Sequence, residues 1–358
     1  MPSYWKHEID EVPYYRDGPL RAQPIAGKEA GEARTAAVVA RTVDVIIAAR
    51  NRSETIERAI LSALTAPEVR HVIVVDDGST DDTAARARHC NATSGRVIVE
   101  RLRANLGPSA ARNVALRIST APWVALLDGD DYLLSGRIGA LLSKADGWDF
   151  VADDLLQARG NQVGEQTLMP ILFDRHFDPR PLSLEQFVLG NVSRRGALRR
   201  ELGFLKPLIR RPFLDRHQLR YDERLRLGED YALYARALAA GARFLIVPAA
   251  GYVAVVRDDS ISSRHSREDL ERLRDSDVEL LAKATLTASE RRALKKHYAS
   301  VDCRAQWVVV IEAVKARKYA RLLVAFCRSP KVSLFLMERL FEELAQRLGK
   351  AIAGRRAF

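Results

Sequence analysis

The sequence predicts an α/β fold, with a mostly parallel sheet flanked by helices and a helical extension at the C-terminus. Two patterns support this prediction. Between residues 43 and 131, short apolar runs rich in β-branched residues alternate with segments of helical periodicity, which is typical of strand–helix–strand units. After Ser263, apolar residues keep helical spacing to the end of the chain.

The first unit of this alternation begins at residue 43. Val43–Ala49 has the length and the composition of a buried strand. Ser53 offers an N-cap to a helix over 54–64, in which apolar residues recur at helical spacing. The next strand, His71–Val75, ends in an acidic turn, and another helix begins at Asp81.

The alternation continues in the middle of the chain. Arg96–Arg101 is predicted as a strand, Gly107–Arg117 as a helix that starts at a glycine, and Trp123–Leu127 as the next strand. A later helix over Asp230–Ala240 precedes a strand over Arg243–Val247. Because ligands bind at the carboxyl ends of the strands in such sheets, the residues that follow the strands are the first candidates for a functional site.

The composition excludes several classes of protein. Of the 358 residues, 47% are hydrophobic and 29% are charged, which is ordinary for a globular chain and unlike a disordered one. The three cysteines are scattered and lack the spacing of a disulfide framework or a zinc site. The N-terminus has no apolar signal segment, and no stretch approaches the roughly 18 apolar residues of a spanning helix. We therefore expect a cytoplasmic protein.

Two acidic clusters directly follow predicted strands. Asp128, Asp130 and Asp131 come after the strand that ends at residue 127, and two carboxylates one residue apart suit a hard divalent cation. Asp76 and Asp77 follow the second strand, where a carboxylate suits a nucleotide base or ribose. The alternative interpretation of both clusters is structural, because Asp and Gly are common in turns, and Asp and Ser are common at helix N-caps.

Three further segments carry charged groups at positions suited to chemistry. Gly107 begins a helix whose N–H groups suit an anion, and Arg112 adds a charged fork. Glu229 and Asp230 begin another helix, where one of them is a candidate general base, although the helix dipole also favours acids there. His265 lies in a hydroxyl-rich loop and is either a metal or diphosphate ligand or a surface histidine.

Together these segments resemble glycosyltransferase family 2, whose catalytic domain has the Rossmann-like GT-A fold. The resemblance runs from Val43 to His265 and rests on the order of five motifs. These motifs are AARN at 48–51, DDGSTDDT at 76–83, GPSAARN at 107–113, DGDD at 128–131 and GEDYALYARAL at 228–238. The last motif and the segment Gly203–Arg211 further resemble bacterial exopolysaccharide glucosyltransferases of the succinoglycan type.

The resemblance implies a binding site for a nucleotide sugar. Asp77 is expected to accept a hydrogen bond from the base of a uridine nucleotide, and Ala48 and Asn51 are expected to line the same pocket. Arg112 is expected near the base or the diphosphate, and Asp128 is expected to bind the ribose or the sugar.

The resemblance also implies a catalytic centre. Asp230 is the expected catalytic base, supported by Glu229. Asp130 is the expected ligand of a Mg²⁺ or Mn²⁺ cofactor, and His265 is a further metal or diphosphate ligand. Such a centre performs a single displacement at the anomeric carbon, in which attack opposite the leaving group inverts the anomer.

The expected domains and reaction follow from this resemblance. Residues 1–40 are expected to form an N-terminal extension, 41–265 the GT-A catalytic domain, and 266–358 a helical, basic C-terminal region. The expected reaction transfers a sugar to a hydroxyl of a glycan or of a lipid-linked oligosaccharide in exopolysaccharide biosynthesis. UDP-glucose is the expected donor.

Two alternative functions fit the sequence less well. A nucleotidyltransferase also uses metal-binding acids on a Rossmann-like sheet, but the segment AARNRSET after the first strand lacks the glycine-rich loop of such enzymes. A non-enzymatic nucleic-acid-binding protein would explain the net charge of +11. However, the sequence contains no RRM, KH, helix-turn-helix or zinc pattern, so we expect no nucleic-acid partner.

Most of the excess positive charge lies in the tail. From Cys303 to the C-terminus there are 12 basic and 4 acidic residues, and apolar clusters recur among them at helical spacing. Helices of this kind lie on anionic membranes, or pack their apolar face on the catalytic domain or on a second subunit. In the first case the protein is peripheral at the inner face of the cell membrane.

Overall fold

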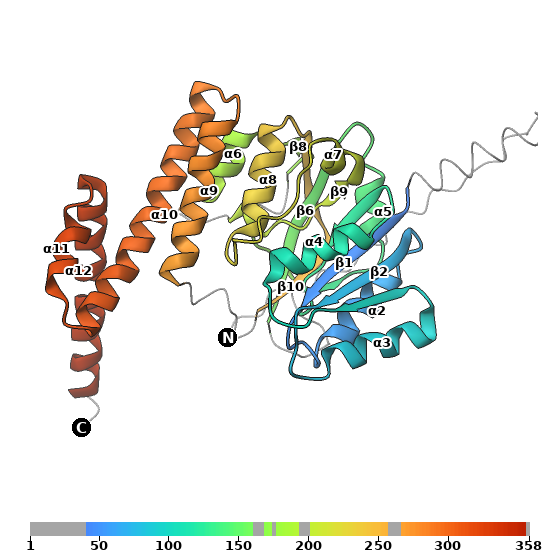
Figure 1. Cartoon of the computed structure of the whole chain (residues 1–358), viewed down its shortest axis with the longest axis horizontal. Helices are drawn as coiled ribbons and strands as arrows, with labels where there is room; N and C mark the ends of the chain where they lie inside the picture. The colour runs from blue at the N-terminus through green and yellow to red at the C-terminus, as the bar shows by residue number, and fades with distance from the viewer. Residues whose placement is uncertain (1–40, 160–167, 174–176, 193–200, 257–265, 356–358) are drawn as a thin grey trace, which may run out of the picture. The chain divides into compact units, whose positions relative to one another are not determined.

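The computed structural model describes residues 41–159, 168–173, 177–192, 201–256 and 266–355. Figure 1 shows a central sheet surrounded by helices, followed in the chain by a helical region. Within these ranges the sheet has ten strands, and its main path runs β3-β2-β1-β4-β9-β6-β10-β5. The predicted α/β fold with a C-terminal helical region is therefore confirmed.

Four parallel strands form the first half of the sheet. β1 pairs with both β2 and β4, and β2 pairs with β3. Because helices cover both faces of this half, β1, β2 and β4 are buried along most of their length, whereas the edge strand β3 is buried only at its first residue. The strands are β1 (Val43–Ala49), β2 (Val69–Asp76), β3 (Val97–Arg101) and β4 (Trp123–Leu126), and the connecting helices are α2 (Ile56–Leu64), α3 (Thr83–Ser94) and α4 (Pro108–Ile118).

A reversed strand joins the two halves of the sheet. β9 (Leu208–Arg210) is antiparallel to β4 on one side and to β6 on the other, whereas β6 and β10 are parallel. The other strands here are β5 (Tyr132–Leu133), β6 (Phe150–Arg159), β7 (Met169–Pro170), β8 (Arg180–Pro181) and β10 (Phe244–Val256). The helices are α5 (Arg137–Leu142), α6 (Leu184–Gly190), η1 (Leu202–Phe204), α7 (Arg211–Arg216) and α8 (Glu229–Ala239).

The sequence does not predict β6, because two aspartates interrupt its apolar run. Asp153 and Asp154 are both fully buried. Asp153 forms an ion pair of 2.6 Å with the buried Arg137, and Asp154 accepts hydrogen bonds from the amides of Leu172 and Phe173, both at 2.9 Å. These partners satisfy the buried carboxylates, so a core strand has a polar sequence.

The predicted N-cap of α2 is wrong. Thr55, not Ser53, precedes the helix, and its side chain makes no capping bond. The amide of Ser53 instead donates to Asp81 at 3.1 Å, and the amide of Arg52 donates to Thr83 Oγ1 at 2.7 Å. The loop after β1 is therefore bonded to the loop after β2, and this cross-link delays the start of the helix.

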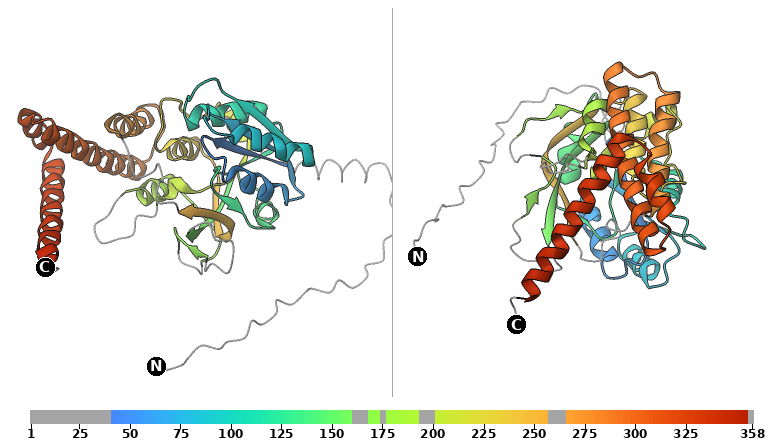
Figure 2. Two further views of the ribbon diagram at one scale, coloured as in Figure 1. Left: turned by 90° about the horizontal axis from the view of Figure 1, so that it is seen from below. Right: turned by 90° about the vertical axis from the view of Figure 1, so that its left-hand side faces the viewer.

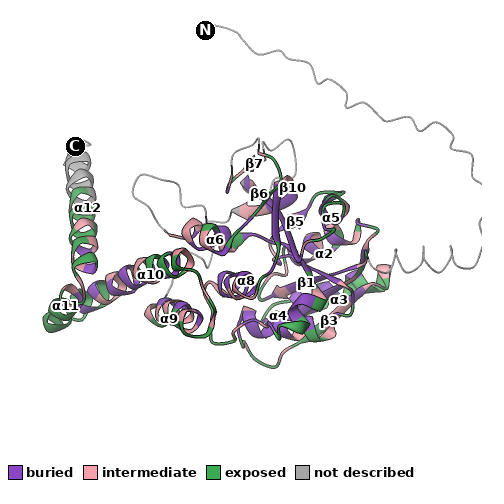
Figure 3. Ribbon diagram, turned by 90° about the horizontal axis from the view of Figure 1, so that it is seen from above, coloured by how far each residue is buried: buried purple, intermediate pink, exposed green. Residues whose placement is uncertain are grey.

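The helices of the C-terminal region contact two different clusters of apolar residues. Leu270 and Leu273 of α9 and Leu294 of α10 belong to the main core. α11 and α12 share a separate small apolar cluster with α10. Figures 2 and 3 show these two helices beside the distal end of α10. These helices are α9 (Arg267–Lys283), α10 (Ala288–Lys315), α11 (Tyr319–Phe326) and α12 (Pro330–Arg355).

The expected domain boundaries stay predictions. β1 begins at Val43, and α9 begins at Arg267, close to the expected limits of the catalytic domain, while the segments 1–40 and 257–265 lie outside the described residues. Among the helices that the structure describes, none combines the length and the apolar character needed to cross a membrane.

Candidate active site

One cleft of about 930 Å³ lies at the carboxyl ends of β1, β2 and β4 and borders the start of α8. Asn51 is not among the residues that line this cleft, and His265 lies outside the described residues. Segments distant in sequence thus meet where strand ends were expected to meet. The predicted site residues that line the cleft are Ala48, Asp77, Arg112, Asp128, Asp130, Glu229 and Asp230.

Asp77 fixes the loop that leads into α4. The carboxylate is buried and accepts hydrogen bonds from the amides of Leu106 at 2.7 Å and Gly107 at 2.9 Å. The neighbouring Gly78 has a φ of +66°, and a Cβ there would lie 2.7 Å from the carbonyl carbon of Ala104. Only glycine fits this approach, so the acidic turn and the loop before α4 form one closely packed unit.

Asn51 has an observed structural role. Its side-chain oxygen accepts a hydrogen bond from the backbone amide of Thr80, and the backbone amide of Asn51 donates to Ser79 Oγ, both at 2.9 Å. Its φ is 52°, in the left-handed region where asparagine is enriched among non-glycine residues. A contact between Asn51 and a nucleotide base stays a prediction.

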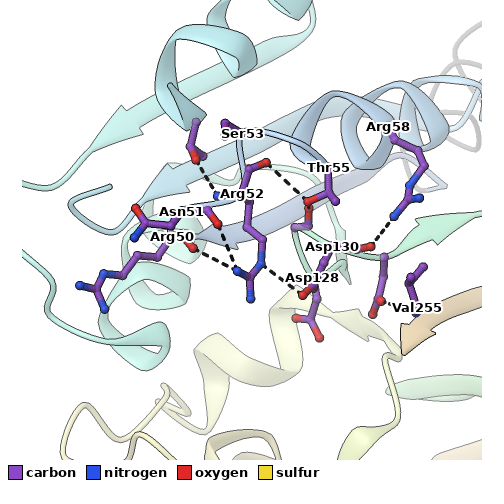
Figure 4. A network of polar contacts seen from close by, with 12 residues as sticks. Arg50, Asn51, Arg52, Ser53, Thr55, Arg58, Asp128, Asp130 and Val255 are labelled. Carbon is purple, nitrogen blue, oxygen red and sulfur yellow. Dashed lines mark hydrogen bonds and ion pairs between the residues drawn. The ribbon is translucent and has the colours of Figure 1, made fainter. Parts of the chain in front are cut away.

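Asp130 presents a carboxylate at the edge of the cleft. Arg52 reaches it from the loop after β1, with an Nε–Oδ2 distance of 3.2 Å (Figure 4). A quarter of the Asp130 side chain is exposed. The backbone of the turn is held by Thr55, whose hydroxyl donates to the carbonyl of Gly129 at 2.7 Å, and by Arg58, which donates to the carbonyl of Asp130 at 2.6 Å. The acidic turn is thus held in place by its backbone.

Asp131, the last acid of the cluster, is bonded to β10. Its carboxylate accepts hydrogen bonds from the Tyr252 hydroxyl at 2.8 Å and the Val255 amide at 2.9 Å. Burial, reinforced by the charges of Asp128 and Asp130, raises the pKa of Asp131 to about 7. This residue ties the acidic turn to the second half of the sheet.

Asp128 lies between two cations. Its oxygens are 2.9 Å from Arg112 Nη2 and 2.9 Å from Lys206 Nζ. Burial opposes ionisation of this carboxyl, but the charges of Lys206 and Arg112 outweigh burial and hold its pKa well below the usual range. Asp128 is therefore an anion whose charge is already compensated by the protein.

Asp230 is buried at the start of α8 and shares both cations with Asp128. Its oxygens lie 2.8 Å from Lys206 Nζ and 3.6 Å from Arg112 Nη1. The hydroxyl of Tyr221 donates to Asp230 at 3.0 Å, and Glu229 forms an ion pair of 2.7 Å with Arg112. The carboxylates of Asp128 and Asp230, expected to act on donor and acceptor respectively, are therefore bridged by one ammonium group.

Lys206 and Tyr221 are the residues of this network that sequence analysis missed. Lys206 is 5% exposed. Its neighbours Leu205, Leu208 and Ile209 are buried. A single lysine within such an apolar segment is the sequence signal that indicates a buried cation, and a buried cation requires a charged partner. No comparable signal marks Tyr221, which contacts Asp230 through the fold alone.

The wall opposite the strand ends is helical. It includes Tyr231, which follows Asp230, and His297 of α10. Buried Asp277 of α9 accepts a hydrogen bond from the Tyr231 hydroxyl at 2.8 Å and lies 2.7 Å from His297 Nδ1. The rings of Tyr231 and His297 stack with centroids 4.2 Å apart. This network joins three helices beside Asp230, and the exposed ring of Phe204 lines the same side of the cleft.

Comparison with known sequences decides the family. The profile described as Glycosyl transferase family 2 matches residues 44–201. The succinoglycan biosynthesis protein ExoU of Rhizobium meliloti is 50% identical over 256 residues, which cover 71% of this chain and 74% of that protein. The chain belongs to glycosyltransferase family 2.

Other relatives of this family 2 glycosyltransferase carry informative names. The succinoglycan biosynthesis protein ExoO of Rhizobium meliloti is 31% identical over 322 residues, or 87% of each chain. A UDP-Glc:alpha-D-GlcNAc-diphosphoundecaprenol beta-1,3-glucosyltransferase, WfaP of Escherichia coli, is 36% identical over 97 residues, which cover 27% of this chain and 38% of that protein.

Solved structures show that the fold is GT-A. TarS of S. aureus, in complex with UDP-GlcNAc, has a TM-score of 0.57 at 21% identity over 72% of this chain and 73% of its own. The mannosyltransferase PcManGT of Pyrobaculum calidifontis, in complex with GDP-Man and Mn²⁺, has a TM-score of 0.52 at 15% identity over 84% of this chain and 79% of its own.

The carboxylate oxygens in the cleft of this glycosyltransferase fit a divalent cation that takes most of its ligands from the substrate. The described residues contain no cluster of three or more His, Cys, Asp or Glu side chains arranged for a metal. Mg²⁺ commonly takes only one or two protein carboxylates and completes its shell with phosphate oxygens and water. Asp130, partly exposed at the edge of the cleft, fits this requirement, whereas Asp128 is already compensated by Lys206 and Arg112.

Proposed function

We propose that this glycosyltransferase is a metal-dependent, inverting enzyme that transfers glucose from UDP-glucose to a hydroxyl of a lipid-linked oligosaccharide in exopolysaccharide biosynthesis. The observation that carries the proposal is the meeting of Asp77, Asp130 and Asp230 in one cleft. The names of ExoU and ExoO support the pathway, and the name of WfaP supports both the donor and a lipid-linked acceptor.

The strand ends are proposed to bind the donor. Both carboxylate oxygens of Asp77 accept a hydrogen bond from the backbone, from Leu106 and Gly107, and the carboxylate is proposed to accept a further one from the N–H of a uracil ring. Asp128 is proposed to accept hydrogen bonds from the ribose or the sugar, with Arg112 close to the diphosphate. These groups are held rigidly before the donor arrives, which lowers the entropic cost of orienting it.

Asp130 is proposed to hold Mg²⁺ or Mn²⁺ together with the donor diphosphate. The metal, when bound, neutralises the charge that grows on the departing diphosphate. In the structure, Arg52 forms an ion pair with the Asp130 carboxylate. We propose that Arg52 turns from Asp130 toward the diphosphate, so that its charge remains within the donor site.

Asp230 is proposed to remove the proton of the acceptor hydroxyl as that oxygen attacks the anomeric carbon. Lys206 and Tyr221 orient the carboxylate, and Glu229 secures Arg112 beside it. Because the donor lies against the strand ends and the base lies across the cleft, the acceptor approaches opposite the leaving group. An α-linked donor then gives a β-glycoside.

The acceptor is proposed to bind along the helical wall. Phe204 has 46% of its surface exposed and lines the cleft together with His297 and Arg304. An exposed aromatic ring suits the apolar face of a pyranose, and the guanidinium of Arg304 suits the diphosphate of a lipid carrier. We place the enzyme in the cytoplasm, at the inner face of the cell membrane where such a carrier is available.

A screen of nucleotide sugars tests the proposal. UDP-glucose, UDP-galactose, UDP-GlcNAc and GDP-mannose are incubated with the enzyme and with Mg²⁺ or Mn²⁺, and release of the nucleotide is measured with and without membrane lipid extract that contains lipid-linked saccharides. We expect release from UDP-glucose that is stimulated by the extract and abolished by EDTA.

The matched controls are Asp230→Asn and the surface variant Asp215→Asn. The first is expected to lose the stimulated release, and the second to keep it, because Asp215 is a partly exposed partner of Arg220 on the surface. Release that is faster from another donor, or unaffected by EDTA, would contradict the corresponding part of the proposal.

A further inference from the structure

The end of α10 and the helix α11 form a surface that is both basic and apolar, called here the basic tip. Its basic residues are Lys315, Arg317, Lys318 and Arg321, all exposed. Its exposed apolar side chains are Val314, Tyr319, Leu323 and Val324, with 53%, 64%, 69% and 73% of their surface accessible. From residue 315 to residue 331 the sequence contains six basic residues and no acidic one.

Internal packing does not account for the apolar side chains of the tip. α11 is attached through Ala325, which is buried, and through the half-buried Leu322 and Phe326. These three residues lie on one side of the helix, with the exposed Tyr319 at the edge of that side, and Leu323 and Val324 lie on the adjoining exposed surface. Figure 3 shows α11 largely in the colour of exposed residues.

The charges of the tip also lack acidic partners within the part of the chain that the structure describes. Among the residues that the structure describes, no acidic side chain forms an ion pair with Lys315, Arg317, Lys318 or Arg321. By contrast, the nearby Arg328 pairs with Asp302 at 2.8 Å. Four exposed cations without an acidic partner among the described residues, beside exposed apolar side chains, form the pattern of a surface that binds an anionic and partly apolar occupant.

α12 offers an instructive contrast. Leu334, Met337, Phe341 and Leu344 form an exposed apolar stripe at helical spacing. Residues 332–345, however, contain three acidic residues and one basic residue. An anionic surface would repel this stripe, whereas it would attract the basic tip. Two tips from two copies of the chain would bring like charges together, which disfavours tip-to-tip association. Contact of a tip with the acidic stripe of another copy is the competing arrangement, and the α12 variant and light scattering test it.

We propose that the basic tip docks on the surface of an anionic lipid bilayer, with Tyr319, Leu323 and Val324 inserted at the level of the headgroups. Each basic residue near such a surface contributes about 1 kcal/mol, which is roughly a fivefold increase in partitioning. The inserted side chains add a contribution that does not depend on salt. This proposal concerns a surface distinct from the cleft and stands independently of the donor and the reaction.

Vesicle sedimentation of the full chain tests the proposal. Large unilamellar vesicles of phosphatidylcholine with about 30% phosphatidylglycerol, an anionic lipid, are compared with vesicles of phosphatidylcholine alone. We expect binding to the anionic vesicles that is at least about tenfold stronger and that falls when salt is raised from about 0.1 M to 0.5 M.

Three sets of substitutions separate the contributions. Arg317→Glu with Arg321→Glu is expected to weaken vesicle binding at least about tenfold, since two attractive charges become repulsive. Leu323→Ser with Val324→Ser is expected to weaken binding by a similar factor and to leave its salt dependence unchanged. Met337→Ser with Phe341→Ser on α12 is the matched control, and we expect it to bind like the unsubstituted protein.

Several outcomes would overturn the proposal. These are failure of the unsubstituted protein to bind anionic vesicles, unchanged binding of the tip variants, or loss of binding in the α12 variant alone. Light scattering tests the alternative occupant, a second copy of the chain. If the tip joins two copies, the unsubstituted protein is a dimer and the tip variants are monomers. Circular dichroism confirms that each variant is folded. None of these measurements uses a sugar donor, so their failure would leave the proposed transfer reaction untouched.

Discussion

The two walls of the cleft hold their carboxylates in different ways. On the strand-end wall, Asp77 is bonded to backbone amides and the carboxylate of Asp130 remains partly exposed. On the helical wall, Asp230 is buried, its charge is compensated by Lys206, and it accepts a hydrogen bond from the Tyr221 hydroxyl. The strand-end wall is therefore fixed mainly by bonds to backbone groups, with the exception of Asp128, which Lys206 and Arg112 hold by ion pairs. The helical wall is fixed by ion pairs and hydrogen bonds between side chains of distant segments.

This difference bears on how each wall is proposed to act. Backbone bonds hold the donor site open with carboxylate oxygens available to a metal and a nucleotide. Ion pairs hold the base in place at the cost of having a cation beside it. Removal of one partner from a buried ion pair is strongly destabilising, by about 3–5 kcal/mol. Substitutions on the helical wall should thus alter both turnover and stability, and those on the strand-end wall mainly donor binding.

Asp230→Asn should show the largest effect. Asparagine preserves the shape but cannot accept the proton of the acceptor, so turnover is expected to fall by about 10² to 10⁴. The affinity for UDP, measured by calorimetry, should change less than turnover, because Asp230 reaches the proposed nucleotide site only through the Arg112 and Lys206 that it shares with Asp128. Unchanged turnover would remove Asp230 from the catalytic role.

Lys206→Met should lower turnover less, by roughly 10², and should also lower the melting temperature. The methionine leaves Asp128 and Asp230 without the ammonium that bridges them at 2.9 and 2.8 Å. Lys206→Arg, which keeps the charge, should recover part of both losses. A methionine variant with normal stability and normal turnover would show that the Lys206 ammonium contributes neither to folding nor to catalysis.

Asp77→Ala should act mainly on the donor. We expect the KM for the nucleotide sugar to rise about tenfold, in line with about 1.5 kcal/mol for a hydrogen bond to a charged group, with a smaller change in kcat. The loop before α4 loses its acceptor in this variant, so a crystal structure or a thermal melt must accompany the kinetics. An effect on kcat alone would move Asp77 out of the donor site.

Asn51 should give the smallest kinetic effect. Since it joins two loops and does not line the cleft, Asn51→Ala is expected to raise the donor KM less than about threefold, while stability falls by about 1–2 kcal/mol from the positive φ and the lost hydrogen bonds. Asn51→Gly avoids the strain of a positive φ and should therefore be more stable than Asn51→Ala. A rise in KM that far exceeds the loss of stability would indicate direct contact with the donor.

The sequence predicted the strand-end wall better than the helical wall for a physical reason. The strand periodicity of residues 43–49 and the acids that directly follow β2 and β4 are local patterns. Lys206 and Tyr221 reach Asp230 from segments 24 and 9 residues away, and only the fold brings them together. For the same reason β6 was missed, because its buried aspartates depend on partners that are remote in the sequence.

The measurement that tests the central claim most directly is the anomeric configuration of the first product, read by NMR from transfer of ¹³C-labelled glucose out of UDP-glucose. If the donor lies on the strand ends and Asp230 acts from the opposite wall, the α-linked glucose of the donor must appear as a β-glycoside. An α-glycoside would contradict attack across the cleft and with it the assignment of the two walls to donor and acceptor.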